Sequence, residues 1–478
     1  MTAMLTTYDQ VAYPSMIFRK SHPDRLAVIA RLHGMEPPAI ETARVLQIGG
    51  GDGLDAIALA TAFPRAHFVN FDIAAQPIAR GRRWSEAAGI ANVRHEILDI
   101  LDAGEQLDGP FDYVIAHGIY AWVPEPVRAA VMPLIRRLLA PNGVAFVSYN
   151  TFPGGHSRIA LREMMRHHVA HITSPPEQLA AVRALLHNFV KAQPTDEPIT
   201  AAMRREAEAA LAYPDGLLFH DGLNAFYYPQ SFTAAVHDAQ AHGLSYLGEA
   251  SGGGLDKGFL DADRAGIEEK DLLHRLQALD YSNGRYFRTS LFVQAEARFS
   301  RVAFDEAART MWVTTGARAA TDALFQVGKR TIRINDPGRA ALLRSIIAAR
   351  PNRMPVASLA ADAELLAALR HYALEDIVEL STVPAPFSSS PADKPQASPL
   401  ARMQIAEGSP TVATLDHQLI TLQDEDLRLL IRLLDGTRDR VALKRCWAEG
   451  AASMPLDRAL ELIAAKALLV ADRQASGD

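Results

Sequence analysis

Short apolar runs alternate with longer amphipathic segments over the first 150 residues of the chain. Apolar runs that predict buried strands occupy 45–48, 67–72, 93–97, 111–116 and 143–148. Apolar residues recur at helical spacing over 54–63, 78–88 and 127–139. Strands that alternate with helices predict an α/β fold, a doubly wound Rossmann-like sheet. Such a sheet binds its ligand at the carboxyl ends of its strands.

The first predicted strand runs directly into a glycine-rich turn. Gly49, Gly51 and Gly53 alternate with other residues, and the next helical pattern begins at Leu54. Glycine allows a tight turn and a close approach of the backbone to a ligand. The helix that follows directs its unpaired N–H groups to the same point. We therefore expect a nucleotide-like ligand at this turn.

An acidic residue ends the second predicted strand, and another follows the third. Asp72 comes about 20 residues after the last glycine, where nucleotide-binding sheets place the carboxylate that binds ribose hydroxyls. Asp99 stands next to the apolar Ile100. A dinucleotide such as NAD is the alternative ligand, but its G-x-G-x-x-G fingerprint would require glycine in place of Leu54.

This arrangement resembles the class I S-adenosylmethionine-dependent methyltransferases. The resemblance implies a set of residues that bind S-adenosyl-L-methionine: Gln47, Gly49, Gly51 and Gly53 for its methionine part, Asp72 and Ile73 for the ribose, Asp99 and Ile100 for the adenine, and His117 beside the donor. Gln47 departs from the family, which usually has Glu or Asp there. An amide accepts hydrogen bonds but carries no charge, so weaker cofactor binding or loss of activity are alternatives.

The pattern changes after Asn150. We expect an N-terminal arm and helix at 1–40, the cofactor-binding domain at 41–156, a helical middle region at 157–300, winged-helix-like units at 301–383 and 413–478, and a linker rich in Pro, Ser and Ala at 384–412. An aromatic stretch at 217–228 fits a substrate groove and a small separate core equally well.

Composition narrows the partners. The net charge is −6 without long runs of one sign, which argues against nucleic-acid binding by the winged-helix-like units. We expect these units to serve protein recognition or dimerisation. Cys446 is the only cysteine, and we predict no metal site and no disulfide. The sequence has no apolar run long enough for a membrane span and no signal-peptide pattern, so a cytoplasmic protein is expected.

Several motifs resemble one bacterial group, the methyltransferases that carry a methyltransferase regulatory domain. They lie at 8–15, 21–26, 115–124, 139–145, 148–156 and 280–288. Similar members include rickettsial enzymes that methylate lysines of an outer-membrane protein. The resemblance implies a protein or peptide amine as acceptor, most simply lysine. The alternatives are a small molecule, an amide or carboxylate of a modified peptide, and a regulator without activity.

The acceptor would lie near the ends of the fourth and fifth strands. The candidate residues there are His117, Tyr120, Trp122, Tyr149, Asn150 and His156, with Tyr13 from the N-terminal arm as lid or packing. The Asn150 carbonyl is suited to orient an amine, and His117 or Tyr120 to accept a proton through water. A structural role is an equally good reading of each one.

Overall fold

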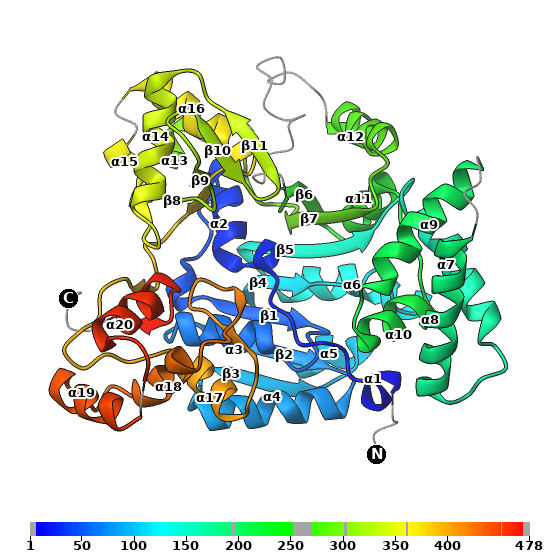
Figure 1. Ribbon diagram of the computed structural model, residues 1–478. Helices are drawn as coiled ribbons and strands as arrows, with labels where there is room; N and C mark the ends of the chain where they lie inside the picture. Colours follow the sequence, from blue (N-terminus) through cyan, green and yellow to red (C-terminus); the bar gives the residue numbers. More distant parts are fainter. Residues whose placement is uncertain are drawn as a thin grey trace.

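The computed structural model describes residues 6–192, 197–251, 269–300, 304–359, 362–450 and 452–471. A seven-stranded sheet in the order β3-β2-β1-β4-β5-β7-β6 lies at the centre (Figure 1). Its strands are β1 Arg44–Ile48, β2 His67–Asp72, β3 Val93–Ile97, β4 Phe111–Ala116, β5 Leu139–Asn150, β6 Leu244–Glu249 and β7 Phe287–Gln294. The first five are mutually parallel, whereas β7 runs antiparallel to β5 and β6. The predicted Rossmann-like fold is confirmed.

Helices cover both faces of the sheet. One apolar core joins it to α2 Pro23–Leu32, α3 Leu54–Ala62 and α4 Ala75–Ala88. A second core joins the other face to α5 Ile100–Gln106, α6 Glu125–Leu138, α11 Phe232–Ala241 and α12 Glu269–Asn283. In β5, Phe146 enters the first core and Val147 the second. Burial of both faces explains why the central strands β4 and β5 are mostly apolar over 111–116 and 143–147.

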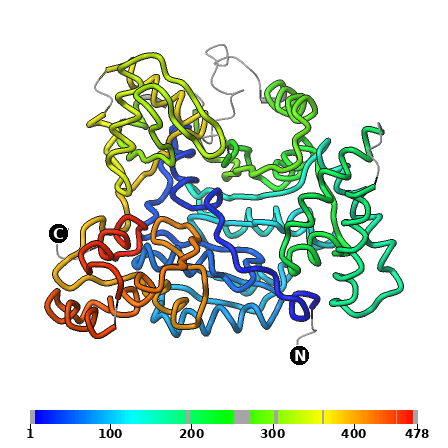
Figure 2. Tube along the Cα trace, in the orientation of Figure 1, coloured from blue at the N-terminus to red at the C-terminus, as the bar shows by residue number. Residues whose placement is uncertain are grey.

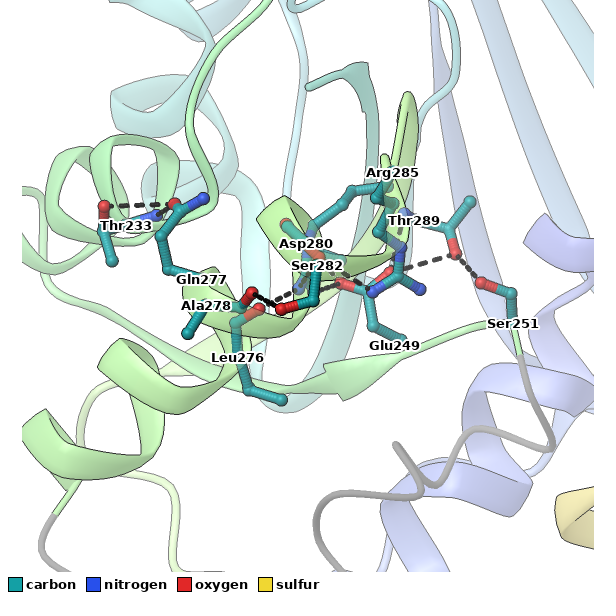
Figure 3. A network of polar contacts seen from close by, with 12 residues as sticks. Thr233, Glu249, Ser251, Leu276, Gln277, Ala278, Asp280, Ser282, Arg285 and Thr289 are labelled. Carbon is teal, nitrogen blue, oxygen red and sulfur yellow. Dashed lines mark hydrogen bonds and ion pairs between the residues drawn. The ribbon is translucent and has the colours of Figure 1, made fainter. Parts of the chain in front are cut away.

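The sheet extends beyond residue 156, the expected limit of the cofactor domain, because β6 and β7 come from the expected middle region. A buried ionic network fixes these two strands to α12 (Figure 3). The fully buried Arg288 donates to Glu249 at 2.9 Å and to both carboxylate oxygens of Asp280 at 2.8 Å. Charges on a sheet strand gave no apolar pattern, so the sequence did not indicate that β7 belongs to this sheet.

Four helices inserted between β5 and α11 form a separate bundle. They are α7 Gly155–His168, α8 Pro175–Lys191, α9 Pro198–Leu211 and α10 Asp215–Leu223. Their own core includes Leu161, Met165, Val182 and Leu218. The bundle and the C-terminal units lie on opposite sides of the sheet in Figure 2.

The first winged-helix-like unit packs on α2. It comprises α13 Phe304–Arg309, β8 Trp312–Thr314, β9 Arg318–Ala319, β10 Leu324–Val327, β11 Arg330–Arg333, α14 Pro337–Ala348, β12 Met354–Pro355, α15 Val356–Leu359, α16 Ala363–Leu374 and β13 Glu379–Ser381. Asp336 and Asp362 cap α14 and α16 by accepting backbone N–H groups. Val28 and Leu32 of α2 belong to the core of this unit.

The second winged-helix unit packs on α3 and α4. It comprises β14 Phe387–Ser388, α17 Pro399–Ala406, β15 Thr411–Ala413, β16 Leu419–Thr421, α18 Glu425–Leu433, α19 Arg440–Glu449, α20 Leu456–Ala465 and β17 Leu469–Val470. The structure differs here from the linker expected at 384–412. That range contains β14, which pairs with β17, and α17, whose Leu400 joins the sheet core. Small side chains suit close packing as well as linkers, so composition does not separate the two.

Candidate cofactor and acceptor site

The turn between β1 and α3 has the shape that its glycines allow. The φ angles of Gly49, Gly51 and Gly53 are +62°, +58° and +69°, in the left-handed region that favours glycine. A Cβ on Gly51 would have no heavy atom within 4 Å, so this part of the backbone faces open space. Another molecule can therefore approach the backbone of Gly51 directly.

Asp72 at the end of β2 supports this turn. Its carboxylate accepts the backbone N–H of Gly51 and that of Ala74, each at 2.9 Å. Burial raises the pKa of Asp72, and the two backbone donors act against this shift. The carboxylate of Asp72 therefore lies directly beside the turn, in the place expected for a ribose ligand.

Exposed apolar side chains lie beyond Asp72, around the ends of β2 and β3. Ile73, Ile97 and Leu101 are 51%, 44% and 55% exposed. Asp99 caps α5 by accepting the Leu101 N–H at 3.0 Å, while Ile100 packs against the second core. The residues present fit S-adenosylmethionine, because an adenine ring would cover this apolar surface. The sequence pattern indicated Ile100 as an adenine contact but not Ile97 or Leu101, because it does not reveal which apolar side chain stays exposed.

Gln47, which stands where the family usually has an acid, contacts the carboxylate of Asp55. Its Nε2 donates to Asp55, the second residue of α3. Asp55 also accepts the Phe18 N–H at 2.8 Å and lies 2.9 Å from His417 Nε2 in the second winged-helix unit. Burial acts to raise the pKa of Asp55, but its His417 neighbour and its hydrogen bonds lower it overall. No pattern in the sequence indicated that Asp55 contacts Phe18 and His417, because these residues lie in three distant segments.

His117 follows β4 and lies in an aromatic environment. Its ring centroid is 3.8 Å from that of Phe18, 5.9 Å from Phe146 and 6.3 Å from Phe287. Nδ1 lies 3.1 Å from the hydroxyl of Ser148. Burial lowers the pKa of His117 to about 4, so the ring is neutral at pH 7.

Asn150 ends β5 with an unsatisfied polar atom. Its side chain is buried, and Oδ1 has no hydrogen-bond partner among the described residues. The hydroxyls of Thr151 and Tyr227 are likewise buried and unpartnered there. Buried polar atoms of proteins are usually paired, and an unpaired one costs about 1–3 kcal/mol. Unpaired oxygens at the ligand edge of the sheet are therefore suited to a bound molecule.

Tyr120 and Tyr149 lie in the second core. The Tyr120 hydroxyl donates to Asp238 of α11 at 2.5 Å, and that of Tyr149 lies 3.1 Å from the Ser290 hydroxyl. Burial raises the pKa of both tyrosines. The structure therefore separates them from the edge that carries Asn150 and His117.

Trp122 faces the inserted helices. Its ring packs against Tyr227 with centroids 4.6 Å apart, and the guanidinium groups of Arg158 and Arg162 lie 5.3 Å and 5.1 Å from it. His156, at the start of α7, stacks on Phe152 at 4.4 Å. The strand-end candidates thus divide between the sheet edge, the core and the inserted bundle.

The N-terminal arm, residues 6–18, connects the bundle to the glycine turn. Tyr13 lies 5.8 Å from His220 of α10, on whose ring Tyr8 stacks at 4.0 Å. Further along, the Ser15 hydroxyl donates to Asp52 within the turn. Tyr13 is therefore held by packing, which is one of the two roles expected for it.

Within the described residues, no three His, Cys, Asp or Glu side chains come together as a metal site would require. In the same part of the chain, no helix combines the length and apolar character needed to span a bilayer.

Comparisons with known proteins agree with this geometry. A methyltransferase domain model matches residues 41–194, and a model of a predicted methyltransferase regulatory domain matches 214–294. The uncharacterised protein RP028 of Rickettsia prowazekii is 34% identical over 236 residues, which are 49% of this chain and 94% of that protein. The chain belongs to the class I S-adenosylmethionine-dependent methyltransferases. Its donor is S-adenosyl-L-methionine.

More distant relatives of this methyltransferase extend the likeness. The model of a PKMT C-terminal winged helix domain matches residues 393–464. The uncharacterised R. prowazekii protein RP789 is 30% identical, across 62% of this chain and 54% of its own length. The structure of PKMT2 from Rickettsia typhi in complex with AdoHcy shares the fold, with a TM-score of 0.80 and 23% identity, and covers 96% of this chain and 100% of that one. An Escherichia coli tRNA 5-carboxymethoxyuridine methyltransferase is 34% identical across 22% of this chain and 40% of its own.

Proposed function

We propose that this methyltransferase transfers a methyl group to the side-chain amine of a protein or peptide, with lysine as the acceptor residue. The observation that carries the proposal is the buried, unpartnered Oδ1 of Asn150 at the end of β5. A carbonyl oxygen accepts an N–H from an amine but repels a carboxylate. The atom is thus complementary to an amine acceptor.

The surroundings of this amide favour an uncharged amine. A lysine ammonium has a pKa of about 10.4 in water, and an apolar environment lowers it. Phe18 and Phe287 flank His117, which is itself neutral because burial lowers its pKa to about 4. When bound, S-adenosylmethionine supplies a methyl group on a positively charged sulfur. The chain has to exclude water and orient the amine, and alignment of reactants contributes about 7–11 kcal/mol in favourable cases.

A polypeptide acceptor is supported by the C-terminal likeness to the PKMT winged helix domain, because the PKMT family hints at methylation of protein lysines. It is also supported by the inserted helices and two winged-helix-like units, which offer more surface than a small molecule requires.

A host lysate incubated with the enzyme and radiolabelled S-adenosylmethionine tests the proposal. We expect label in a polypeptide band and recovery of methyl-lysine after acid hydrolysis of that band. Label confined to small molecules would contradict it. Binding of S-adenosylhomocysteine without any transfer would instead identify a regulator.

A second candidate is a carboxylate acceptor, favoured by the charges beside Trp122. Arg158 pairs with Asp221 at 2.9 Å, whereas the buried Arg162 donates to the backbone carbonyls of Asp221 and Asn224. Burial and the neighbouring Arg158 lower the pKa of Arg162 to about 10. Arg158, Arg162 and Asp221 line a small cavity of about 20 Å³. A methyl ester formed on a carboxylate is released by mild base, whereas a methylamine is retained, so base treatment of the labelled band separates the two.

A further inference from the structure

We propose that His417 is a positioning residue for the cofactor, through which the second winged-helix unit holds the glycine turn in its ligand-binding shape. The inference rests on cofactor binding by the family and is independent of the acceptor. Its structural basis is the contact between His417 and Asp55.

The contact joins two distant parts of the chain within a buried space. His417 and Asp55 are 4% and 7% exposed, and Nε2 lies 2.9 Å from Oδ1 across a sequence separation of 362 residues. Asp55 follows Gly53 by two positions, in the first turn of α3. Because a buried carboxylate requires donors, the loss of one partner changes where this side chain can rest.

Asp55 in turn orients Gln47 beneath the glycine turn. The Gln47 amide N–H donates to Asp55, which leaves Oε1 on the other side. A Cβ placed on Gly50 would clash with Oδ1 of Asn70 and lie 3.2 Å from this Oε1, so Gln47 and Asn70 together lie against the backbone of the turn. A continuous chain of contacts therefore runs from His417 through Asp55 and Gln47 to the backbone of the glycine turn. This chain offers a physical role for glutamine at a position where the family usually has an acid.

The backbone at His417 supports a role for its side chain. Its φ of +53° lies in the left-handed region, which is uncommon for residues other than glycine, although Asn, Asp and His adopt it more often than the rest. The residue occupies the turn between β15 and β16, where its N–H donates to Thr414 at 3.1 Å. Glycine or asparagine would suit this turn better. The imidazole makes its hydrogen bond to Asp55 through Nε2. Its Nδ1 has no partner among the described residues.

Other contacts hold the winged-helix unit in place without His417. Trp84 Nε1 donates to Glu407 at 2.8 Å, and Leu400 and Met403 of α17 enter the core shared with α3. Arg353 lies between Asp24 of α2 and Asp416, at 3.7 Å and 3.5 Å. A change confined to residue 417 therefore probes the contact with Asp55 rather than docking of the unit.

Calorimetric titration of full-length variants with S-adenosylhomocysteine tests this role. His417→Asn suits the left-handed backbone but is too short to reach Asp55, and we expect it to weaken binding about ten-fold, within the usual range for coupled sites. His417→Gln keeps a donor of suitable length and should restore most of the affinity. Trp84→Phe removes the other interface hydrogen bond and should leave the affinity unchanged.

Thermal unfolding of each variant, measured in parallel, identifies any loss of fold. If His417→Asn stays folded and binds as tightly as the parent protein, the proposal is wrong. It is equally wrong if Trp84→Phe weakens binding as much, because general docking would then account for the effect. If His417→Asn fails to fold, Asp55→Asn in the same titration decides, since it removes the charge but keeps the size. No acceptor is needed, so failure here leaves the proposed amine specificity untouched.

Discussion

The ring of Phe18 lies against the imidazole of His117, with their centroids 3.8 Å apart. The backbone N–H of Phe18 also donates to Asp55 at 2.8 Å. One residue of the N-terminal arm therefore contacts both the end of β4 and the helix that follows the glycine turn.

Replacement of Phe18 by alanine should expose His117 to water. Because burial lowers the pKa of His117 to about 4, we expect it to rise toward the ordinary value of about 6.5. Nuclear magnetic resonance of the labelled imidazole as a function of pH measures this shift. An unchanged His117 titration would mean that other groups keep the ring dry.

Removal of the Asp72 side chain should weaken cofactor binding. Asp72→Ala loses the acceptor of the Gly51 N–H as well as the proposed ribose ligand, and we expect at least a ten-fold increase in the dissociation constant of S-adenosylhomocysteine, equal to about 1.4 kcal/mol. Asp102→Ala, on the surface of α5, is the matched control. Full affinity in Asp72→Ala would exclude the ribose assignment.

Asn150 variants should affect turnover more than donor binding. In Asn150→Ala the proposed amine loses its hydrogen-bond acceptor, so we expect kcat to fall about 100-fold, the cost of a misaligned reactant. The affinity for S-adenosylhomocysteine should remain within about two-fold, a change of roughly 0.4 kcal/mol. An initial-rate assay of the identified acceptor measures the first value. A variant that keeps full turnover would remove Asn150 from the site.

Acidification should destabilise the protein through His95. Burial lowers its pKa from 6.5 to about 4, so the folded state favours the neutral ring. The contribution of this group is complete above pH 6.5 and is lost as the pH falls to 4, by roughly 3 kcal/mol. Urea unfolding at pH 7.5 and pH 4.5 should show a smaller difference for His95→Gln. An identical pH dependence in both proteins would contradict this.

Arg288 should contribute far more to stability than its partly exposed neighbour Arg285, which also pairs with Asp280. Arg288→Met leaves Glu249 and Asp280 without their buried counter-charge, and we expect a loss of about 3–5 kcal/mol. Arg285, whose side chain is 28% exposed and 3.4 Å from Asp280, should cost about 1 kcal/mol or less on replacement by methionine. Urea unfolding compares them, and equal losses would argue against this division.

Local patterns predicted much of this fold. The strands at 67–72, 93–97 and 111–116 have the bounds that the sequence pattern indicates, and the glycine turn lies where the pattern placed it. Tyr149, which the sequence grouped with Asn150, lies in the second core, because adjacent strand residues point to opposite faces. The pairing of His417 with Asp55 leaves no local signal, since each residue is ordinary within its own segment.

Helix α2 contributes side chains to two separate apolar cores. Leu26 and Ile29 on one side fill the space under the central sheet, while Val28 and Leu32 complete the interior of the unit that begins with α13. A fragment that ended before α13 would therefore lack this unit and would expose Val28 and Leu32 of α2 to water. A transplant of the unit onto another enzyme would have to include the ten residues of α2, which lie far from the unit in the sequence.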